Sequence, residues 1–272
     1  GGATVDGLVN PKLSLIFRPH DDFELYLNGG GGFHSNDARG TTTQIDPTDL
    51  SGTAVADTVD PLARQWGSEL GARWQPSEKV HLTSVAWFLD SESELVFVGD
   101  AGTTEPAGSS ERYGVEVTGF LRPLPWLALD ASYSWSDGGF KNRPPGQDRI
   151  PNGLEHVVGA GATVTAGAVS SSLRLRYFAA YPLIEDNTQR AGSTTLVNWS
   201  SAYTWRRVTF DLTVVNLFDS KDNDIQYSYA SRLASELPAP PTPAPPAETV
   251  QPRTHVHPVE PRMLRGTVRI AF

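Results

Sequence analysis

Cysteine is absent from this chain of 272 residues, so neither a disulfide framework nor a thiolate metal site can form. Excess basic charge is absent as well: 22 Lys and Arg residues stand against 31 Asp and Glu residues, and the net charge of -9 argues against a nucleic-acid partner. No apolar run approaches the roughly 18 residues that a membrane-spanning helix needs. A membrane-spanning strand escapes that last test, because only every second residue would face lipid.

The segment 262–272 shows what the chain has instead, which is strict alternation of apolar and polar side chains. Successive residues of a strand point to opposite faces, so one face of this segment is apolar and the other carries guanidinium groups. The apolar face consists of Leu264, Gly266, Val268, Ile270 and Phe272, and the other face of Arg265, Thr267, Arg269 and Ala271. A last strand that ends on Phe is typical of outer-membrane barrels, where the apolar face meets lipid and the aromatic lies at the membrane interface.

The same alternation recurs along the whole chain and predicts about eleven strands. Short turns and long loops connect these strands in turn, as they do in outer-membrane barrels, with turns in the periplasm and loops outside the cell. The predicted turns lie near residues 19–22, 76–78, 123–124, 166–168 and 206–207, and the longest loops near 35–65 and 217–261. A proline-rich run at 238–246 cannot join a strand ladder and is expected to be an exposed polyproline segment.

A soluble β-sandwich or propeller is the alternative fold, in which the apolar faces would form a core. Such a fold needs no regular succession of short turns and long loops. It would also not normally place Arg, Asp and Glu opposite every apolar face. We therefore predict an all-β fold, a transmembrane antiparallel β-barrel.

Three stretches of the sequence resemble the TonB-dependent receptors of the bacterial outer membrane. Asn216-Leu217-Phe218-Asp219 resembles a signature of that family, and Pro261-Arg262 followed by a strand that ends at Phe272 looks like its last strand. Residues 33–40 and 60–63 resemble loop sequence of some members. The resemblance implies a barrel of about 22 strands around a plug. Eleven strands would be half of it, so residues 1–272 are expected to be the C-terminal part, completed by the remaining barrel half and plug from another chain or a missing segment.

The resemblance also implies a function and a set of partners. It predicts active transport of a scarce nutrient, such as a ferric siderophore, another metal chelate, a cobalamin or an oligosaccharide, energised through TonB. Its expected partners are a TonB-type energy transducer, outer-membrane lipid and a small-molecule ligand, with no nucleic acid. A passive porin or structural outer-membrane barrel is the alternative, followed by an outer-membrane hydrolase.

Candidate site residues are few. The histidines are scattered and form no catalytic constellation, so we expect neither an enzyme nor a bound cofactor. His255 and His257 would face the same way in an extended segment and could contact a metal, and Asp219, Asp222 and Asp224 resemble a calcium-type cluster. Solvated loop residues are the preferred interpretation of both groups, and no metal site is predicted. The residues expected to bind ligand from extracellular loops are His34, Asp37, Arg39, His255 and His257.

Overall fold

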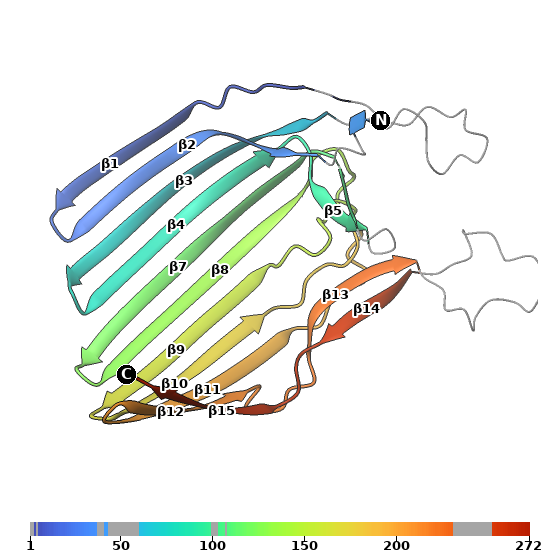
Figure 1. Cartoon of the computed structure of the whole chain (residues 1–272). Helices are drawn as coiled ribbons and strands as arrows, with labels where there is room; N and C mark the ends of the chain where they lie inside the picture. Colours follow the sequence, from blue (N-terminus) through green and yellow to red (C-terminus); the bar gives the residue numbers. More distant parts are fainter. Residues whose placement is uncertain are drawn as a thin grey trace, which may run out of the picture.

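The structure is a computed structural model that describes residues 3, 5–36, 41–42, 60–98, 103–106, 108–230 and 252–272. Eleven strands form one antiparallel sheet, which confirms the predicted fold class and strand number; the sheet is not closed into a barrel (Figure 1). No helix in these ranges is long and apolar enough to cross a membrane. In spatial order the strands of the sheet are β1 (Lys12–His20), β2 (Phe23–Ser35), β3 (Leu62–Ser77), β4 (Val80–Ser91), β7 (Ser110–Leu124), β8 (Leu127–Phe140), β9 (His156–Ala166), β10 (Val169–Phe178), β11 (Thr194–Trp205), β12 (Val208–Val215) and β15 (Met263–Ile270).

Two small hairpins lie outside this sheet, and the sequence pattern did not predict them. One pairs β5 (Leu95–Val98) with β6 (Thr103–Pro106), and the other pairs β13 (Asn223–Ala230) with β14 (Pro252–Pro258). The second hairpin lies within the long loop expected at 217–261. The polyproline run expected at 238–246 lies outside the described residues.

The connections separate as the sequence predicted. All tight turns gather at one end of the sheet, and the long connections and both hairpins gather at the other (Figure 1). Two of the turns require the left-handed backbone conformation, with φ of 58° at Gly167 and 55° at Arg206. We call the two ends of the sheet the turn end and the loop end.

Register fixes which side chains share a face. One lateral row of mutually paired residues is apolar across six strands: Leu15, Leu27, Leu70, Ala86, Val115 and Trp135. Leu15, Leu27 and Leu70 are 53%, 46% and 59% exposed, so these side chains do not form a buried core. Exposed aromatic residues mark both margins of this face, with Trp74, Trp126, Tyr203 and Trp205 near the turn end and Trp66, Tyr113 and Tyr133 toward the loop end. Two aromatic margins around an apolar band are the pattern of a lipid-facing barrel wall.

The other face is polar, and its charges pair with one another across strands. The Glu24 carboxylate accepts hydrogen bonds from Arg18 at 2.7 Å and from Arg73 at 2.6 Å. The pairs Asp130–Arg174 and Asp211–Arg269 are also formed on this face. Glycine makes room for the largest side chains here: a Cβ at Gly71 would lie 2.1 Å from the ring of Tyr26. These charged side chains therefore have partners within the sheet itself.

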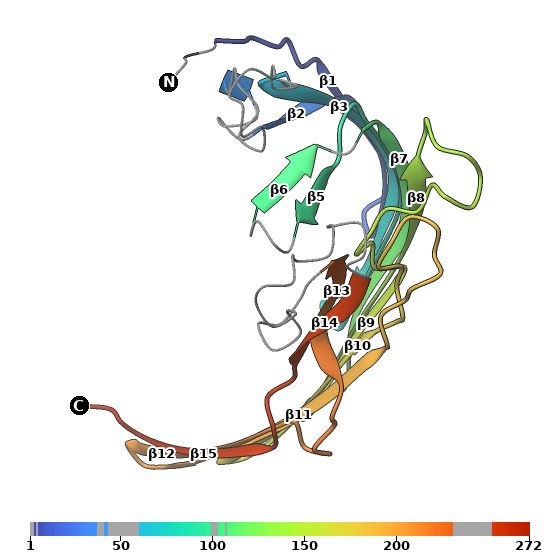
Figure 2. The same ribbon diagram turned by 90° about the vertical axis from the view of Figure 1, so that its right-hand side faces the viewer.

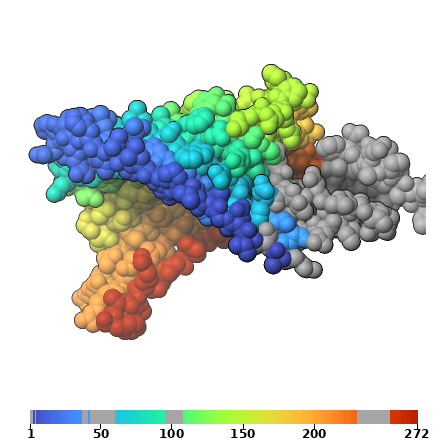
Figure 3. Space-filling view, turned by 90° about the horizontal axis from the view of Figure 1, so that it is seen from above, coloured from blue at the N-terminus to red at the C-terminus, as the bar shows by residue number. Residues whose placement is uncertain are grey.

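The sheet is strongly curved, and the polar face is the concave one. Figure 2 shows both hairpins on the concave side of the sheet. Arg112 lies on the polar face because it alternates with Tyr113 and Val115, which lie on the apolar face. It pairs with Glu94 at 2.9 Å, immediately before the β5–β6 hairpin. β1 and β15 form the two opposite margins of the curved surface (Figure 1 and Figure 3).

Candidate ligand-binding site at the loop end

One face of the β13–β14 hairpin is fixed to the connection between β10 and β11, residues 179–193. Gln226, only 7% exposed, donates from its side-chain amide to Gly192 O at 3.0 Å and accepts from Gly192 N at 3.1 Å. The Tyr181 hydroxyl donates to Gln226 O at 2.9 Å and accepts from Gln226 N at 3.1 Å. Burial raises the pKa of Tyr181, so this hydroxyl stays protonated and able to donate. Tyr181 packs with Leu183 and Ala191 in the small core cluster of the described residues.

The opposite face of the hairpin carries a stack of rings formed by Tyr227, Tyr229 and His255. Tyr227 pairs directly with His255 across the two strands, and Tyr229 follows on the same face. The Tyr229 and His255 ring centroids are 3.9 Å apart with planes 14° from parallel, and the Tyr227 and Tyr229 centroids are 5.5 Å apart at 8°. We call these residues the ring stack.

Both C-terminal histidines of the predicted site are therefore on one face of the hairpin. His257 pairs with Ile225, next to the ring stack, and its Nδ1 lies 2.7 Å from Asp224 Oδ1. The i, i+2 spacing identified His255 and His257, but not the tyrosines. The alternation of Ile225, Tyr227 and Tyr229 with polar neighbours is the sequence signal that could have predicted a strand here. Ligand binding by these residues stays a prediction.

The remaining predicted site residues are placed differently. His34, expected in a loop, lies in β2, because β2 remains paired with β3 as far as Ser35. Its Nδ1 is 3.3 Å from Gln65 Nε2 on the polar face. Asp37 and Arg39 lie outside the described residues.

The last connection joins β12 to β15, and its acidic residues do not converge on one point. Asp222 accepts from Thr195 N at 2.7 Å, whereas Asp224 faces His257 and Asp219 faces Lys221. Throughout the described ranges, no group of three or more His, Cys, Asp or Glu residues could hold a metal ion.

The signature Asn216-Leu217-Phe218-Asp219 closes the last connection at its base. Asn216 is only 1% exposed and adopts φ of 50°. Its Nδ2 donates to Ser220 O and Glu260 O, both at 2.9 Å, and its Oδ1 accepts from Ser220 N at 2.8 Å. Asp219 accepts from Arg262 N at 3.1 Å. These bonds join the start of the connection to its end, and we call this arrangement the base clasp.

Asp219 is also the electrostatic part of the base clasp. A hydrogen bond from Lys221, followed by the one from the Arg262 backbone, holds the pKa of Asp219 below its ordinary value. The carboxylate is therefore charged at neutral pH, and its bonds across the clasp persist.

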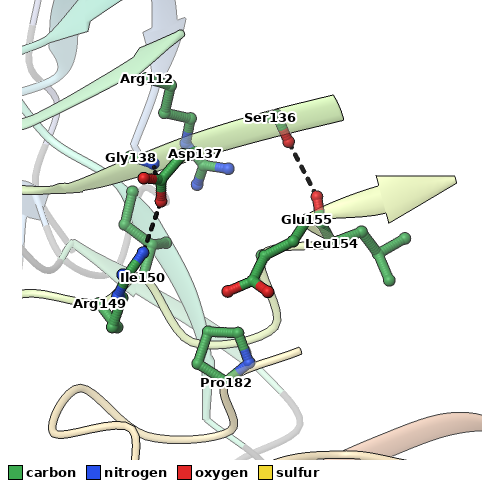
Figure 4. Close-up of a pocket in the computed structure, with 10 residues that line it drawn as sticks. Arg112, Ser136, Asp137, Gly138, Arg149, Ile150, Leu154, Glu155 and Pro182 are labelled. Atoms are coloured by element: carbon green, nitrogen blue, oxygen red, sulfur yellow. Dashed lines mark hydrogen bonds and ion pairs between the residues drawn. The ribbon is translucent and has the colours of Figure 1, made fainter. Parts of the chain in front are cut away.

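A second cluster of charges binds the neighbouring loops to the wall (Figure 4). Asp137 Oδ1 accepts from Arg149 Nη1 at 2.5 Å, and Arg190 Nη2 donates to Glu155 at 2.8 Å. The cavity lined by Asp137, Arg149 and Glu155 measures about 30 Å³, which is room for about two water molecules and too small for a nutrient.

Glu94 anchors the start of the β5–β6 hairpin in a comparable way. Its burial raises the pKa, but hydrogen bonds from Arg112 and Ser110 outweigh this effect and leave the pKa below its ordinary value. The charged loop-end clusters thus fix the positions of connections, whereas the ring stack lies on the hairpin face opposite Gln226.

Comparison with known proteins agrees with this architecture. Residues 1–217 match the family described as TonB dependent receptor-like, beta-barrel. A probable TonB-dependent receptor, BfrD of Bordetella pertussis, is 27% identical over 129 residues, which cover 44% of this chain and 16% of that protein. The ferric yersiniabactin uptake receptor FyuA of Yersinia pestis superposes with a TM-score of 0.72 at 18% identity, over 96% of this chain and 37% of that one.

The copper transporter OprC superposes with a TM-score of 0.67 at 14% identity, over 96% of this chain and 39% of that one. This chain thus spans well under half the length of these relatives. The family consists of transport receptors rather than enzymes. With more than half of its residues matched and an eleven-stranded wall of the same shape, the chain belongs to the TonB-dependent receptor β-barrel family.

Proposed function

We propose that this chain is part of a bacterial outer-membrane receptor that imports a metal chelate by transport energised through TonB. The curved wall carries the proposal: its convex face is apolar with aromatic margins, and its concave face is hydroxyl-rich and charged. A water-filled or plugged interior inside lipid needs this division of side chains. Relatives of similar fold are named for ferric yersiniabactin uptake and for copper transport, which favours a chelated metal as cargo.

The proposed partners follow from the open edges of the sheet. β1 and β15 are the first and last of eleven strands in which every neighbouring pair is antiparallel, so they run in the same direction. Closing the sheet on itself would require a parallel pair inside an antiparallel barrel. An open edge is not tolerated in lipid, because its N–H and C=O groups would lack partners. Further strands and a plug, from the same protein or another chain, therefore complete the receptor.

In the proposed mechanism the loop end receives the ligand. Ligand bound there shifts the receptor toward a state from which the plug can be rearranged. A TonB-type transducer then supplies the energy for that rearrangement, and the chelate passes along the polar concave face. The chain's own contribution is the rigid wall and the ligand-facing residues of its hairpins.

Uptake in cells tests the proposal. The gene for the full-length receptor is deleted and restored, and accumulation of radioactive iron or copper chelates is measured with and without an energised membrane and TonB. Restored uptake that disappears without TonB is the expected result. Uptake that persists without TonB would support a passive porin instead and overturn the transport mechanism.

Engineered disulfides test completion by further strands, since the chain has no native cysteine. Thr213→Cys with Arg265→Cys should oxidise readily in the full-length receptor, because these residues are paired in register. Ser14→Cys with Arg265→Cys should stay reduced. Efficient oxidation of the second pair would mean that β1 and β15 meet directly, and the proposed plugged receptor would be wrong.

A further inference from the structure

A series of hydrogen bonds crosses the concave face of the sheet at the loop end. It begins at His34 in β2, passes through Gln65 in β3 and reaches Ser91 at the end of β4. Gln65 Nε2 lies 3.3 Å from His34 Nδ1 and donates to Ser91 Oγ at 3.2 Å. Ser91 Oγ in turn donates to Ser93 O at 2.7 Å. We call these four residues the His34 relay.

The atom types fix the direction of every bond in the His34 relay. An amide NH2 group can only donate, so His34 Nδ1 accepts and the neutral ring carries its proton on Nε2. This Nε2 atom is buried and has no hydrogen-bond partner within the part of the chain that the structure describes. Ser91 is only 1% exposed, so water cannot replace a lost partner of its hydroxyl. The relay therefore fits neutral His34 only.

Protonation of His34 reverses the relay. Nδ1 then carries a hydrogen and faces the N–H groups of Gln65, donor against donor. When the Gln65 amide turns to present Oε1 instead, this oxygen and Ser91 Oγ face each other as two acceptors. Ser91 relieves that contact by turning its O–H away from Ser93 O. Whichever arrangement the protonated relay adopts, one hydrogen bond at a buried position is lost.

The charges around His34 allow it to take up a proton. The charged residues of the described elements next to this end of β2 are Asp60, Arg64, Glu92, Glu94 and Arg112. Desolvation raises the pKa of Glu94, whereas its bonds from Arg112 and the positive charge of His34 lower it. Glu94 and His34 are thus close enough to interact, and a carboxylate stabilises an imidazolium ion. Histidine is also the side chain that ordinarily changes its charge between pH 5 and 8.

We propose that the His34 relay is a proton-sensitive switch for the connection between β4 and β5. Ser93 and Glu94 belong to this connection, which leads into the β5–β6 hairpin on the concave side of the sheet (Figure 2). At neutral pH the relay holds the connection. In mild acid the bond lost at Ser91 loosens it, and the hairpin loosens with it. The switch depends on these side chains alone, whereas its consequence for uptake rests on the proposed transport function.

Hydrogen exchange on the full-length receptor in detergent micelles tests the switch at about pH 7.5 and about pH 5.5, on either side of the ordinary titration of histidine. The reporters are the backbone amides of Glu92 and Glu94, whose hydrogen bonds to carbonyl oxygens measure 2.9 Å each. Their protection, relative to the intrinsic exchange rate at each pH, should fall about two- to tenfold in acid, the range that one neutral hydrogen bond supports. His34→Asn keeps an acceptor but does not titrate, so its protection should be independent of pH.

Two further variants separate the relay from other effects of acid. Gln65→Leu interrupts the relay and should lose the acid response. His81→Asn makes the matched change on the same face near the turn end and should keep the wild-type response. Equal protection of β9 and β10 in all variants shows that the sheet remains folded.

Wild-type protection that is the same at both pH values would overturn the switch. A wild-type acid response in His34→Asn or in Gln65→Leu would also overturn it, because the proton would then act elsewhere. TonB-dependent uptake in cells is measured separately, so the proposed transport function stands or falls on its own result.

Discussion

Replacing Asn216 should open the last connection without unfolding the wall. Asn216→Ala removes three hydrogen bonds at a fully buried position, worth about 1 kcal/mol each, or about 3 kcal/mol together. Alanine at φ of 50° adds about 1 kcal/mol of backbone strain, which brings the local cost to about 4 kcal/mol. This corresponds to a roughly thousandfold increase in the open fraction. Asn216→Gly loses the same bonds without the strain, so its cost should be about 1 kcal/mol smaller.

Hydrogen exchange, followed by mass spectrometry on the full-length receptor, measures the free-energy cost of each of the two substitutions. Protection should fall at residues 217–222 and 259–262, more in the Ala variant than in the Gly variant, while the turn at 167–168 stays unchanged. Wild-type protection in Asn216→Ala would refute the base clasp. Loss of protection across the whole wall would show that Asn216 supports the sheet rather than the connection.

Three further predictions concern the wall and the base clasp. Gly71→Ala would place a methyl group 2.1 Å from a tyrosine ring atom and should cost about 1–3 kcal/mol in unfolding by urea, whereas Gly67→Ala on the same face meets only ordinary contacts and should be near neutral. Leu173→Arg on the apolar face should cost about 2–4 kcal/mol in lipid, and Ser172→Arg much less; equal costs would mean a soluble core. Because the pKa of Asp219 is lowered in the folded state, its contribution is present above the ordinary carboxylate pKa and lost as pH falls through the folded value. Exchange at 259–262 should therefore rise in acid below about pH 4, and Asp219→Asn should abolish that pH dependence; an unchanged acid response would contradict the assignment.

The main sheet could be predicted because its physics is local. Period-two alternation places Leu264, Val268 and Ile270 on one face whatever lies beside the strand, and their observed partners Val214, Phe210 and Val208 are apolar too. Turn residues then set the strand ends. Strand count and the separation of turns from loops both follow from these signals.

The hairpins and the ring stack could not be predicted by the same means. Tyr227 and His255 are distant in sequence, and only pairing of β13 with β14 brings their rings to 5.7 Å. His34 was assigned to a loop because residues 33–40 resemble loop sequence, yet β2 continues through the preceding glycines as far as Ser35. In each of these cases the structure depends on which strands pair, and the pattern of a single strand does not contain that information.

The last connection differs from a free loop because it is fixed at two levels. Asn216 and Asp219 join its two ends at the base, and Gln226 fixes the hairpin to the connection between β10 and β11. Movement of the hairpin away from the sheet therefore requires the two bonds between Gln226 and Gly192 to break. Opening the base clasp while leaving Gln226 intact should thus raise hydrogen exchange at residues 217–222 and 259–262 but not in β13, whereas Gln226→Ala should raise exchange within β13.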